Sequence, residues 1–208
     1  MTKGMRKDFQ REIKLNFSRF LSITLIVVLG VAFFSGLRAA KPAMQASADK
    51  QYDSENLMDI RVAGTLGMTD KDVDALKKVD GVQDAEGTYE QDFLCDTGSS
   101  EAVTKVMSLN DGISLVRVSE GRFPQGYNEC IADRSFLDAT GYKIGDTVKL
   151  TTGTDEKVSK YLATDEFTIV GVGTTSMYMD SDRGSAAIGT GRINGFLIVP
   201  KQAFTMSC

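Results

Sequence analysis

The hydrophobic pattern begins with a long apolar run near the N-terminus. Residues 20–37 form 18 consecutive positions without a charged side chain. A helix of that length rises about 27 Å, close to the thickness of the hydrocarbon core of a bilayer. A helix in the core of a soluble protein would carry a polar stripe, and this run has none. The pattern therefore predicts a transmembrane helix over residues 20–37.

Residues 1–19, which precede this run, combine apolar and basic positions with a helical period. Phe9, Ile13, Phe17 and Phe20 recur at helical spacing, while basic residues occupy the other positions. This pattern predicts a basic amphipathic helix that lies on the inner membrane face and leads into the span. The helix is either a plain membrane-surface segment or a docking surface for a cytoplasmic partner. Periodicity alone favours the plain segment.

Short alternating segments bounded by glycine follow the span and predict an α+β domain over residues 38–208. We expect the helix to continue from the span to about residue 53, with Pro42 as a kink or a boundary. A second helix is expected to begin at Thr69, where Asp72 completes a capping box. A third helix is expected to be capped by Asp133.

The remaining segments are assigned from their alternation and their flanking turn residues. A loop is expected over residues 174–192, which are rich in Gly, Ser, Thr and Asp. Strands are predicted within the segments 57–64, 81–95, 102–110, 113–122, 129–132, 146–151, 165–173 and 195–199.

The charge distribution divides the chain just after the apolar run. Residues 1–41 hold eight basic and two acidic side chains, whereas the whole chain has a net charge of −4, so residues 42–208 are acidic. Because basic residues concentrate on the cytoplasmic side of a span, we expect a cytoplasmic N-terminus and an extracytoplasmic location after residue 37. An acidic folded domain also argues against nucleic acid as a partner.

A cleaved signal peptide is the alternative to an anchor. Residues 46–48, Ala-Ser-Ala, have the small-x-small form of a cleavage site. The apolar run, however, exceeds the usual h-region of about 7–15 residues, and the triplet lies well past its end. These features favour an uncleaved anchor in the cell membrane.

The composition offers little for catalysis. The chain has no His, which removes the usual general base and the usual zinc ligand. Its three cysteines show no C-x-x-C spacing, and their odd number favours buried free thiols over a disulfide between Cys95 and Cys130. We therefore expect no catalytic residues, no cofactor, no metal and no enzymatic activity in this chain.

Two glycine-rich segments and one acidic segment suggest other binding sites. Residues 171–176 resemble a glycine turn, but they lack the third glycine and the following helix of a dinucleotide-binding motif. Residues 189–195 are likewise typical of a turn. Asp155, Glu156, Asp180 and Asp182 could supply oxygens for calcium, but without the EF-hand spacing. We interpret all three segments as turns and solvated loops.

A series of short motifs over residues 121–172 resembles the extracytoplasmic core domain of FtsX-like, MacB-type ABC transporter permeases. The motifs are a G-R-x-P turn, an E-C-hydrophobic strand, a K-x-G-D-x-V-x-L strand and a strand ending V-G-V. In this sequence they comprise Gly121, Arg122, Pro124, Glu129, Cys130, Ile131, Lys143, Gly145, Asp146, Val148, Leu150, Ile169, Val170, Gly171 and Val172. Residues 19–37 are similar to the first span of the same permeases.

The resemblance implies a transport role. Such permeases pair with a separate cytoplasmic ATPase, and the chain itself contains no G-x-x-x-x-G-K-[ST] phosphate loop. It is thus expected to be the N-terminal part of a permease, because relatives carry further spans, and to dimerise with itself or with another permease. The exported or extracted substrate would be a peptide, a drug or a lipid. The alternative is a single-span anchored module that binds or senses a ligand outside the cell.

The resemblance also assigns a role to the N-terminal amphipathic helix. That helix would lie near the ATPase and take part in coupling ATP hydrolysis to movement of the external domain. The candidate ATPase-coupling surface consists of Phe9, Arg11, Ile13, Lys14 and Phe17.

Overall fold

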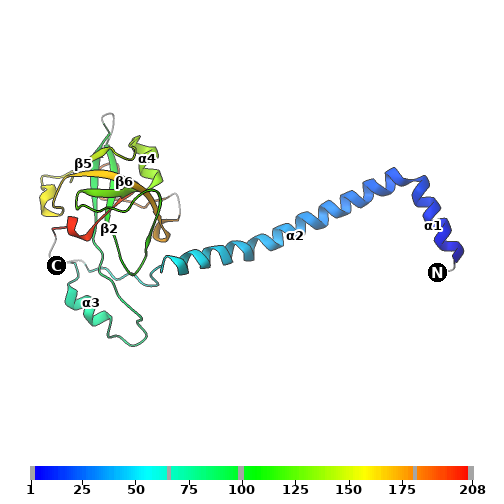
Figure 1. Cartoon of the computed structure of the whole chain (residues 1–208), viewed down its shortest axis with the longest axis horizontal. Helices are drawn as coiled ribbons and strands as arrows, with labels where there is room; N and C mark the ends of the chain where they lie inside the picture. The colour runs from blue at the N-terminus through cyan, green and yellow to red at the C-terminus, as the bar shows by residue number, and fades with distance from the viewer. Residues whose placement is uncertain (1–2, 65–66, 98–100, 180–181, 206–208) are drawn as a thin grey trace. The chain divides into compact units, whose positions relative to one another are not determined.

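The computed structural model describes residues 3–64, 67–97, 101–179 and 182–205 (Figure 1). The chain divides into two compact units, Met1–Lys50 and Gln51–Cys208. Helix α1 (Lys3–Leu15) and most of helix α2 (Phe17–Ser54) belong to the first unit, and the last turn of α2 belongs to the second.

Helix α2 contains the predicted span and is twice its length. Among the described residues it is the one helix that is long and apolar enough to cross a membrane, and none of its residues is buried. The helix continues through Pro42 to Ser54, so Pro42 does not form a boundary. The residues beyond 37 extend the apolar run into a polar helical stalk.

The predicted continuous amphipathic helix is wrong in one respect, because Asn16 interrupts it. Residue 16 adopts a turn conformation between α1 and α2. The asparagine side chain competes with the helical backbone for hydrogen bonds, which makes Asn a common point of interruption. Phe17 and Phe20 therefore belong to α2, whereas Phe9 and Ile13 belong to α1.

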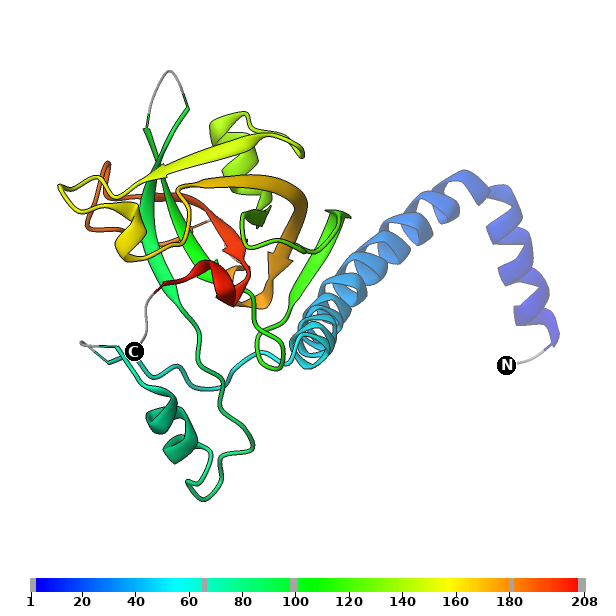
Figure 2. The same ribbon diagram turned by 60° about the vertical axis from the view of Figure 1, so that its left-hand side comes forward.

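The second unit is built on one mixed seven-stranded sheet. Its strands are β1 (Glu90–Asp96), β2 (Glu101–Ser108), β3 (Val116–Gly121), β4 (Glu129–Ala132), β5 (Thr147–Thr151), β6 (Glu166–Thr175) and β7 (Ile193–Val199). The order is β3-β6-β4-β7-β2-β1-β5, and β5 also pairs with β6, so six of the strands close into a barrel. Figure 2 shows the strands curving around a common interior. The predicted α+β fold is confirmed, with the sheet closed on itself.

Closure depends on β6, which pairs with three partners along its ten residues. It pairs with β5 near its start, with β4 in its middle and with β3 near its end. At Gly171 an added Cβ would lie 2.6 Å from the carbonyl oxygen of Arg122, so this position requires glycine. The V-G-V motif thus marks the point where β3 crosses close to β6.

The barrel interior is apolar and contains both described cysteines. Cys95 and Cys130 are buried free thiols, as predicted, and Cys208 lies outside the described residues. Burial raises the pKa of the Cys95 thiol to about 11. The largest fully buried side chains are Phe93, Phe136, Phe167, Phe196, Ile131, Leu150, Leu162, Ile169, Leu197 and Ile198.

Helix α4 (Arg134–Thr140) packs on β7 and is capped as predicted. The Asp133 carboxylate accepts hydrogen bonds from the backbone N–H groups of Phe136 at 2.8 Å and Phe196 at 3.1 Å. It also forms a buried ion pair with Arg183 at 3.0 Å. One side chain therefore caps α4, binds β7 and holds the loop after β6.

The G-R-x-P motif forms a rigid turn before β4. The guanidinium of Arg122 donates two hydrogen bonds to the Glu129 carboxylate, at 2.8 and 2.6 Å. The backbone N–H of Gln125 donates to the same carboxylate at 2.7 Å. Together these donors lower the pKa of Glu129 to about 2.

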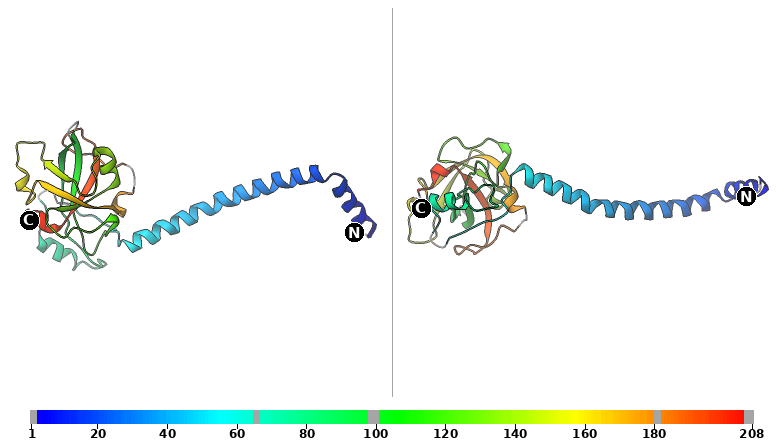
Figure 3. Two further views of the ribbon diagram at one scale, coloured as in Figure 1. Left: turned by 45° about the horizontal axis from the view of Figure 1, so that its top comes forward. Right: turned by 90° about the horizontal axis from the view of Figure 1, so that it is seen from below.

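Residues 57–89 form a segment outside the barrel, which we call the arm. Its helix α3 (Asp70–Leu76) has the predicted capping box at Thr69 but buries none of its residues. The predicted strand over residues 57–64 is wrong, because the described part of this segment forms no strand. Alternation of apolar and polar residues shows that a segment suits a sheet, but it does not show that a neighbouring strand is available to pair with it. Helix α3 lies below the barrel in Figure 1 and in the left view of Figure 3.

Three short 3₁₀ helices complete the unit. They are η1 (Val158–Lys160), η2 (Ser176–Tyr178) and η3 (Lys201–Ala203). Helix η2 lies near the start of the segment predicted as a loop, and η3 directly follows Pro200.

We expect Gly195→Ala to destabilise the barrel by roughly 2–3 kcal/mol, because it forces a methyl group into a closely packed contact. A Cβ at this position would lie 2.5 Å from the backbone nitrogen of Phe136. Gly87→Ala is the matched control, because its Cβ would meet only Val73, at 3.5 Å. Denaturant unfolding of the full chain in detergent measures both, and equal stabilities would contradict the packing argument.

Candidate functional site

The end of α2 has a defined shape that directs the chain into the second unit. Asn56 adopts a left-handed conformation with φ of 47°. The N–H of Leu57 donates to the carbonyl of Tyr52 at 3.0 Å, and the N–H of Asn56 donates to the carbonyl of Asp53 at 3.2 Å. These two bonds form a Schellman motif, which satisfies the last carbonyls of the helix and fixes the direction in which the chain leaves it.

Glu55 binds the end of α2 to two strands of the sheet. Its side chain is 4% exposed, which is rare for a carboxylate. It accepts hydrogen bonds from the backbone N–H of Ser176, at 2.9 Å, and from the Ser176 hydroxyl. It also pairs with Arg117 at 3.2 Å. Because Arg117 lies on β3 and Ser176 directly follows β6, this carboxylate ties the helix to both strands.

The loop 109–115 pairs with the backbone just after α2. The N–H of Ser114 donates to the carbonyl of Asn56 at 2.8 Å, and the N–H of Leu115 donates to the carbonyl of Glu55 at 2.7 Å. The Ser114 hydroxyl accepts from the N–H of Met58 at 3.2 Å. Ser114 is buried and left-handed, with φ of 53°, a conformation that an L-residue keeps only when its surroundings hold it.

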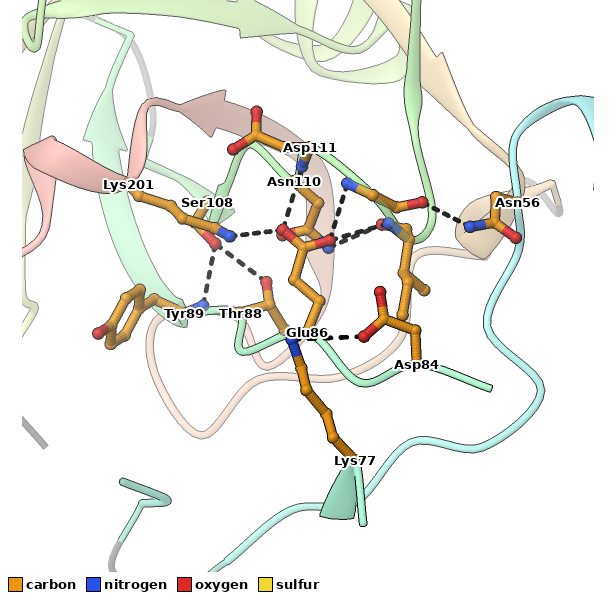
Figure 4. Close-up of polar contacts among 12 residues, drawn as sticks. Asn56, Lys77, Asp84, Glu86, Thr88, Tyr89, Ser108, Asn110, Asp111 and Lys201 are labelled. Carbon is orange, nitrogen blue, oxygen red and sulfur yellow. Dashed lines mark hydrogen bonds and ion pairs between the residues drawn. The ribbon is translucent and has the colours of Figure 1, made fainter. Parts of the chain in front are cut away.

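Glu86 holds the same loop from the side of the arm (Figure 4). Its carboxylate accepts hydrogen bonds from three consecutive backbone N–H groups, those of Asp111 (3.0 Å), Gly112 (3.0 Å) and Ile113 (2.8 Å). The Lys201 ammonium binds the same carboxylate. Burial alone would raise the pKa of Glu86, but Lys201 and the three N–H donors outweigh it and hold the pKa below its ordinary value.

Further contacts fix the arm where it enters the barrel. The Ser108 hydroxyl lies 3.0 Å from the Thr88 hydroxyl and accepts from the N–H of Tyr89 at 3.0 Å. Lys77 and Asp84 form an ion pair at 3.3 Å at the base of α3, also drawn in Figure 4. The arm is thus attached at its barrel end, while α3 has no apolar anchor of its own.

We define the joint as the loop 109–115 together with Glu55, Asn56 and Glu86. The loop is held by α2 on one side and by the arm on the other. A cavity beside it, lined by Thr88, Ser108 and Ser114 among others, has a volume of about 20 Å³. That space suits a single water molecule and is too small for an organic ligand. The joint connects the end of α2, the arm and the sheet, beside a second, open hollow of about 310 Å³ that is lined by Leu109, Asp111 and Phe123 among others.

Acidic and cysteine side chains do not form a cluster at the joint or elsewhere among the described residues. No group of three Cys, Asp or Glu side chains comes together there in a way that could hold a metal ion. Of the acidic residues considered for calcium, Asp180 lies outside the described residues. Glu156 instead pairs with Lys160 through an exposed contact.

The predicted ATPase-coupling residues belong to the first unit, whereas the residues of the joint belong to the second. Phe9, Arg11, Ile13 and Lys14 belong to α1, and Phe17 is the first residue of α2. The sequence reasoning missed the joint entirely, because Glu55 and Glu86 belong to no motif. One signal was available for Glu55: it directly follows a long helix and precedes Asn, a residue that favours the left-handed position after a helix.

Comparison with known proteins identifies the fold family. Residues 20–207 match the model of the MacB-like periplasmic core domain. No curated protein matches the sequence significantly.

Two solved structures are similar at low identity. One is the extracellular domain of the noncanonic ABC-type transporter YknZ from Gram-positive bacteria, with 14% identity and a TM-score of 0.40 over 66% of this chain and 64% of that chain. The other is the periplasmic region of MacB from Actinobacillus actinomycetemcomitans, with 14% identity and a TM-score of 0.37 over 66% of this chain and 56% of that chain. The chain therefore spans less than two thirds of the length of either.

We expect Glu55→Ala to destabilise the second unit by about 2–3 kcal/mol, because it leaves the buried N–H of Ser176 without an acceptor. Thermal unfolding of the full chain in detergent measures the change. Asp49→Ala is the control, since it removes an exposed carboxylate from the same helix and should change stability by less than about 0.5 kcal/mol. Equal effects of the two variants would show that Glu55 does not hold the joint.

The bonds of Glu86 should weaken in acid. Because the pKa of Glu86 is lowered in the folded state, its stabilising contribution is complete above the unfolded pKa of about 4.3. The contribution is lost as the pH falls through the lower, folded pKa. The difference in melting temperature between the wild type and Glu86→Gln should therefore shrink between pH 6 and pH 3. Asp80→Asn, which neutralises an exposed acid on the arm, is the control for the loss of one negative charge. A difference between the wild type and Glu86→Gln that stays the same at both pH values would contradict this prediction.

Proposed function

The chain belongs to the MacB-like periplasmic core domain family, and we propose that it is the N-terminal part of a permease subunit of an ABC transporter. In this proposal α2 anchors the chain in the cell membrane, with α1 in the cytoplasm and the second unit outside. The acidic second unit, the basic N-terminal segment and the long apolar helix support this orientation.

The joint is the observation that carries the proposal. If α2 spans the membrane, any tilt or displacement of this helix reaches Glu55 and Asn56 through an unbroken helical backbone. From there the buried carboxylate and the backbone bonds pass the displacement to the loop 109–115, to β3 and to the end of β6. A module that only tethered a binding domain would need no such connection, since a flexible linker would suffice. A module that signals inward would need the connection too, so the presence of an ATPase partner decides between that module and a transporter.

The energy source in this proposal is a separate cytoplasmic ATPase. The chain has no phosphate loop of its own, and we expect no catalytic activity from it. Its cytoplasmic contact would be α1, through Phe9, Arg11, Ile13 and Lys14, with Phe17 at the start of the span. ATP-driven movement would then be coupled to export or extraction of a peptide, a drug or a lipid by a homodimer or heterodimer of permeases.

The test is to purify the tagged native protein from its own membranes and to identify what accompanies it. We expect an ABC-type ATPase in constant proportion, and ATP hydrolysis by the complex. Glu55→Ala should change that hydrolysis rate several-fold without loss of the ATPase, because it loosens the link between α2 and the sheet. Asp49→Ala should leave the rate unchanged.

Two results would contradict the proposal in different ways. Absence of any ATPase from the wild-type preparation would overturn the transporter assignment and favour a single-span anchored sensing module. An ATPase whose activity is identical in the wild type and in Glu55→Ala would retain the assignment but remove the joint from the coupling mechanism.

A further inference from the structure

An open hollow with a volume of about 310 Å³ lies beside the loop 109–115. The loop supplies most of the lining, through Leu109, Asn110, Asp111 and Leu115. The rest comes from Val116, the first residue of β3, and from Phe123, which follows the end of that strand. The volume is at the lower limit for ligand sites in proteins, which is about 300 Å³. The open hollow is therefore large enough to hold part of a ligand, whereas the water-sized cavity nearby is not.

The walls of the open hollow are mainly apolar. Leu109, Leu115 and Val116 are half-buried, and Phe123 is 48% exposed. The Phe123 side chain belongs to the turn that the G-R-x-P motif forms, so a fixed backbone presents the ring. An apolar surface of this kind gains free energy when another apolar group displaces water from it.

Asp111 adds one charge to these walls. Its backbone N–H donates to Glu86, whereas its carboxylate points away from Glu86 in Figure 4. That carboxylate is exposed and has no ion pair or hydrogen bond with any group that the structure describes. Glu86, by contrast, is paired with Lys201. Because the second unit as a whole is also acidic, the open hollow favours a cation beside an apolar group.

Strand β3, which contributes Val116, lies at the edge of the sheet. Its one partner among the described strands is β6, so its other edge is not paired with a strand there. Leu115 and Val116 lie at the beginning of β3 and Phe123 lies beyond its end, so the open hollow extends beside this strand. A bulge after Val118 limits regular pairing to a few residues. An unpaired edge beside an apolar hollow is a combination by which proteins recognise short extended peptides.

We propose that the open hollow binds a short extended peptide that adds to the outer edge of β3. The peptide would place an apolar side chain against Phe123 and a Lys or Arg side chain beside Asp111. A peptide is favoured over a small amine because the edge of β3 offers backbone groups that a second peptide backbone satisfies along its length.

This inference rests on the proposed function, and it deepens that function by naming basic, apolar peptide segments as the substrate class. The bound peptide would contact the loop 109–115, which Glu55 and Asn56 hold to the end of α2. Peptide binding and the position of α2 would therefore be coupled to each other.

A tryptophan in the open hollow tests the site, because the chain contains no Trp and has no background emission. Phe123→Trp is placed in the full chain in detergent and titrated with the blocked peptide acetyl-Leu-Lys-Leu-Leu-Lys-amide, which presents Leu and Lys on both sides when extended. We expect a saturable shift of the emission to shorter wavelength. Tyr127→Trp is the matched control, because Tyr127 is exposed in the same turn but does not line the hollow. Equal shifts at the two positions would indicate adsorption to the surface or to detergent and would overturn the inference.

The role of charge is tested in the Phe123→Trp background. Asp111→Asn should weaken peptide binding by about fivefold or more, whereas Asp80→Asn, which neutralises an exposed acid on the arm, should leave it unchanged. The analogue acetyl-Leu-Glu-Leu-Leu-Glu-amide should bind about tenfold more weakly than the Lys peptide. Equal affinity for the two peptides, or an affinity that Asp111→Asn does not alter, would contradict recognition by Asp111.

Strand addition is tested with two N-methylated forms of the Lys peptide, one methylated at its odd residues and one at its even residues. Each form lacks the N–H donors of one edge of the extended chain. One form should bind about tenfold more weakly than the parent peptide, and the other should bind as the parent does. Full binding of both forms, or displacement of the peptide by an equal concentration of hexylamine, would show that the site takes a small amine and would overturn the peptide assignment.

These measurements are independent of the ATPase. Peptide binding by a chain that copurifies with no ATPase would retain this site and overturn the transporter function. An ATPase in the native preparation together with no peptide binding would retain the transporter function and overturn this inference.

Discussion

A carboxylate cannot remain buried in a protein unless donors surround it, and this requirement at Glu55 determines how the molecule is joined. The donors come from Ser176, after β6, and from Arg117, on β3. Both groups must be in place for α2 to end where it does. The left-handed turn at Asn56 and the strained conformation of Ser114 follow from the same junction, because the chain must leave the helix and immediately pair with the loop 109–115.

Glu86 applies the same principle from the other side of the loop. The carboxylate of Glu86 accepts hydrogen bonds from three consecutive backbone N–H groups of the loop. It thereby satisfies donors that the loop would otherwise have to expose to water. The loop thereby becomes a rigid element without any secondary structure of its own. Strand β6 holds the barrel together, because it pairs with β5, β4 and β3 along its length and so closes the sheet. In the proposed function, the joint is the point where a displacement of α2 would reach the sheet.

Local chemistry allowed much of the barrel to be predicted. Strand β4, the cap at Asp133 and the capping box at Thr69 follow from neighbouring residues, and the structure has each of them. The strand expected over residues 57–64 failed because alternation indicates a suitable surface and not a partner. The joint could not be predicted, because Glu55 meets Ser176 across 121 positions of sequence, and only the folded sheet brings them together. Likewise, the motif residues Arg122 and Glu129 look like ordinary surface charges in the sequence. In the structure they form a bidentate ion pair.

The length of α2 has a mechanical consequence. The helix continues for 17 residues beyond the apolar run, from Arg38 to Ser54. These residues form a rod of about 25 Å, and a change of roughly 10° in the tilt of a membrane-spanning helix would move its far end by about 4 Å. If α2 spans the membrane as proposed, the helix would act as a lever, which would convert a small angular change within the bilayer into a displacement comparable to the spacing between two adjacent β-strands.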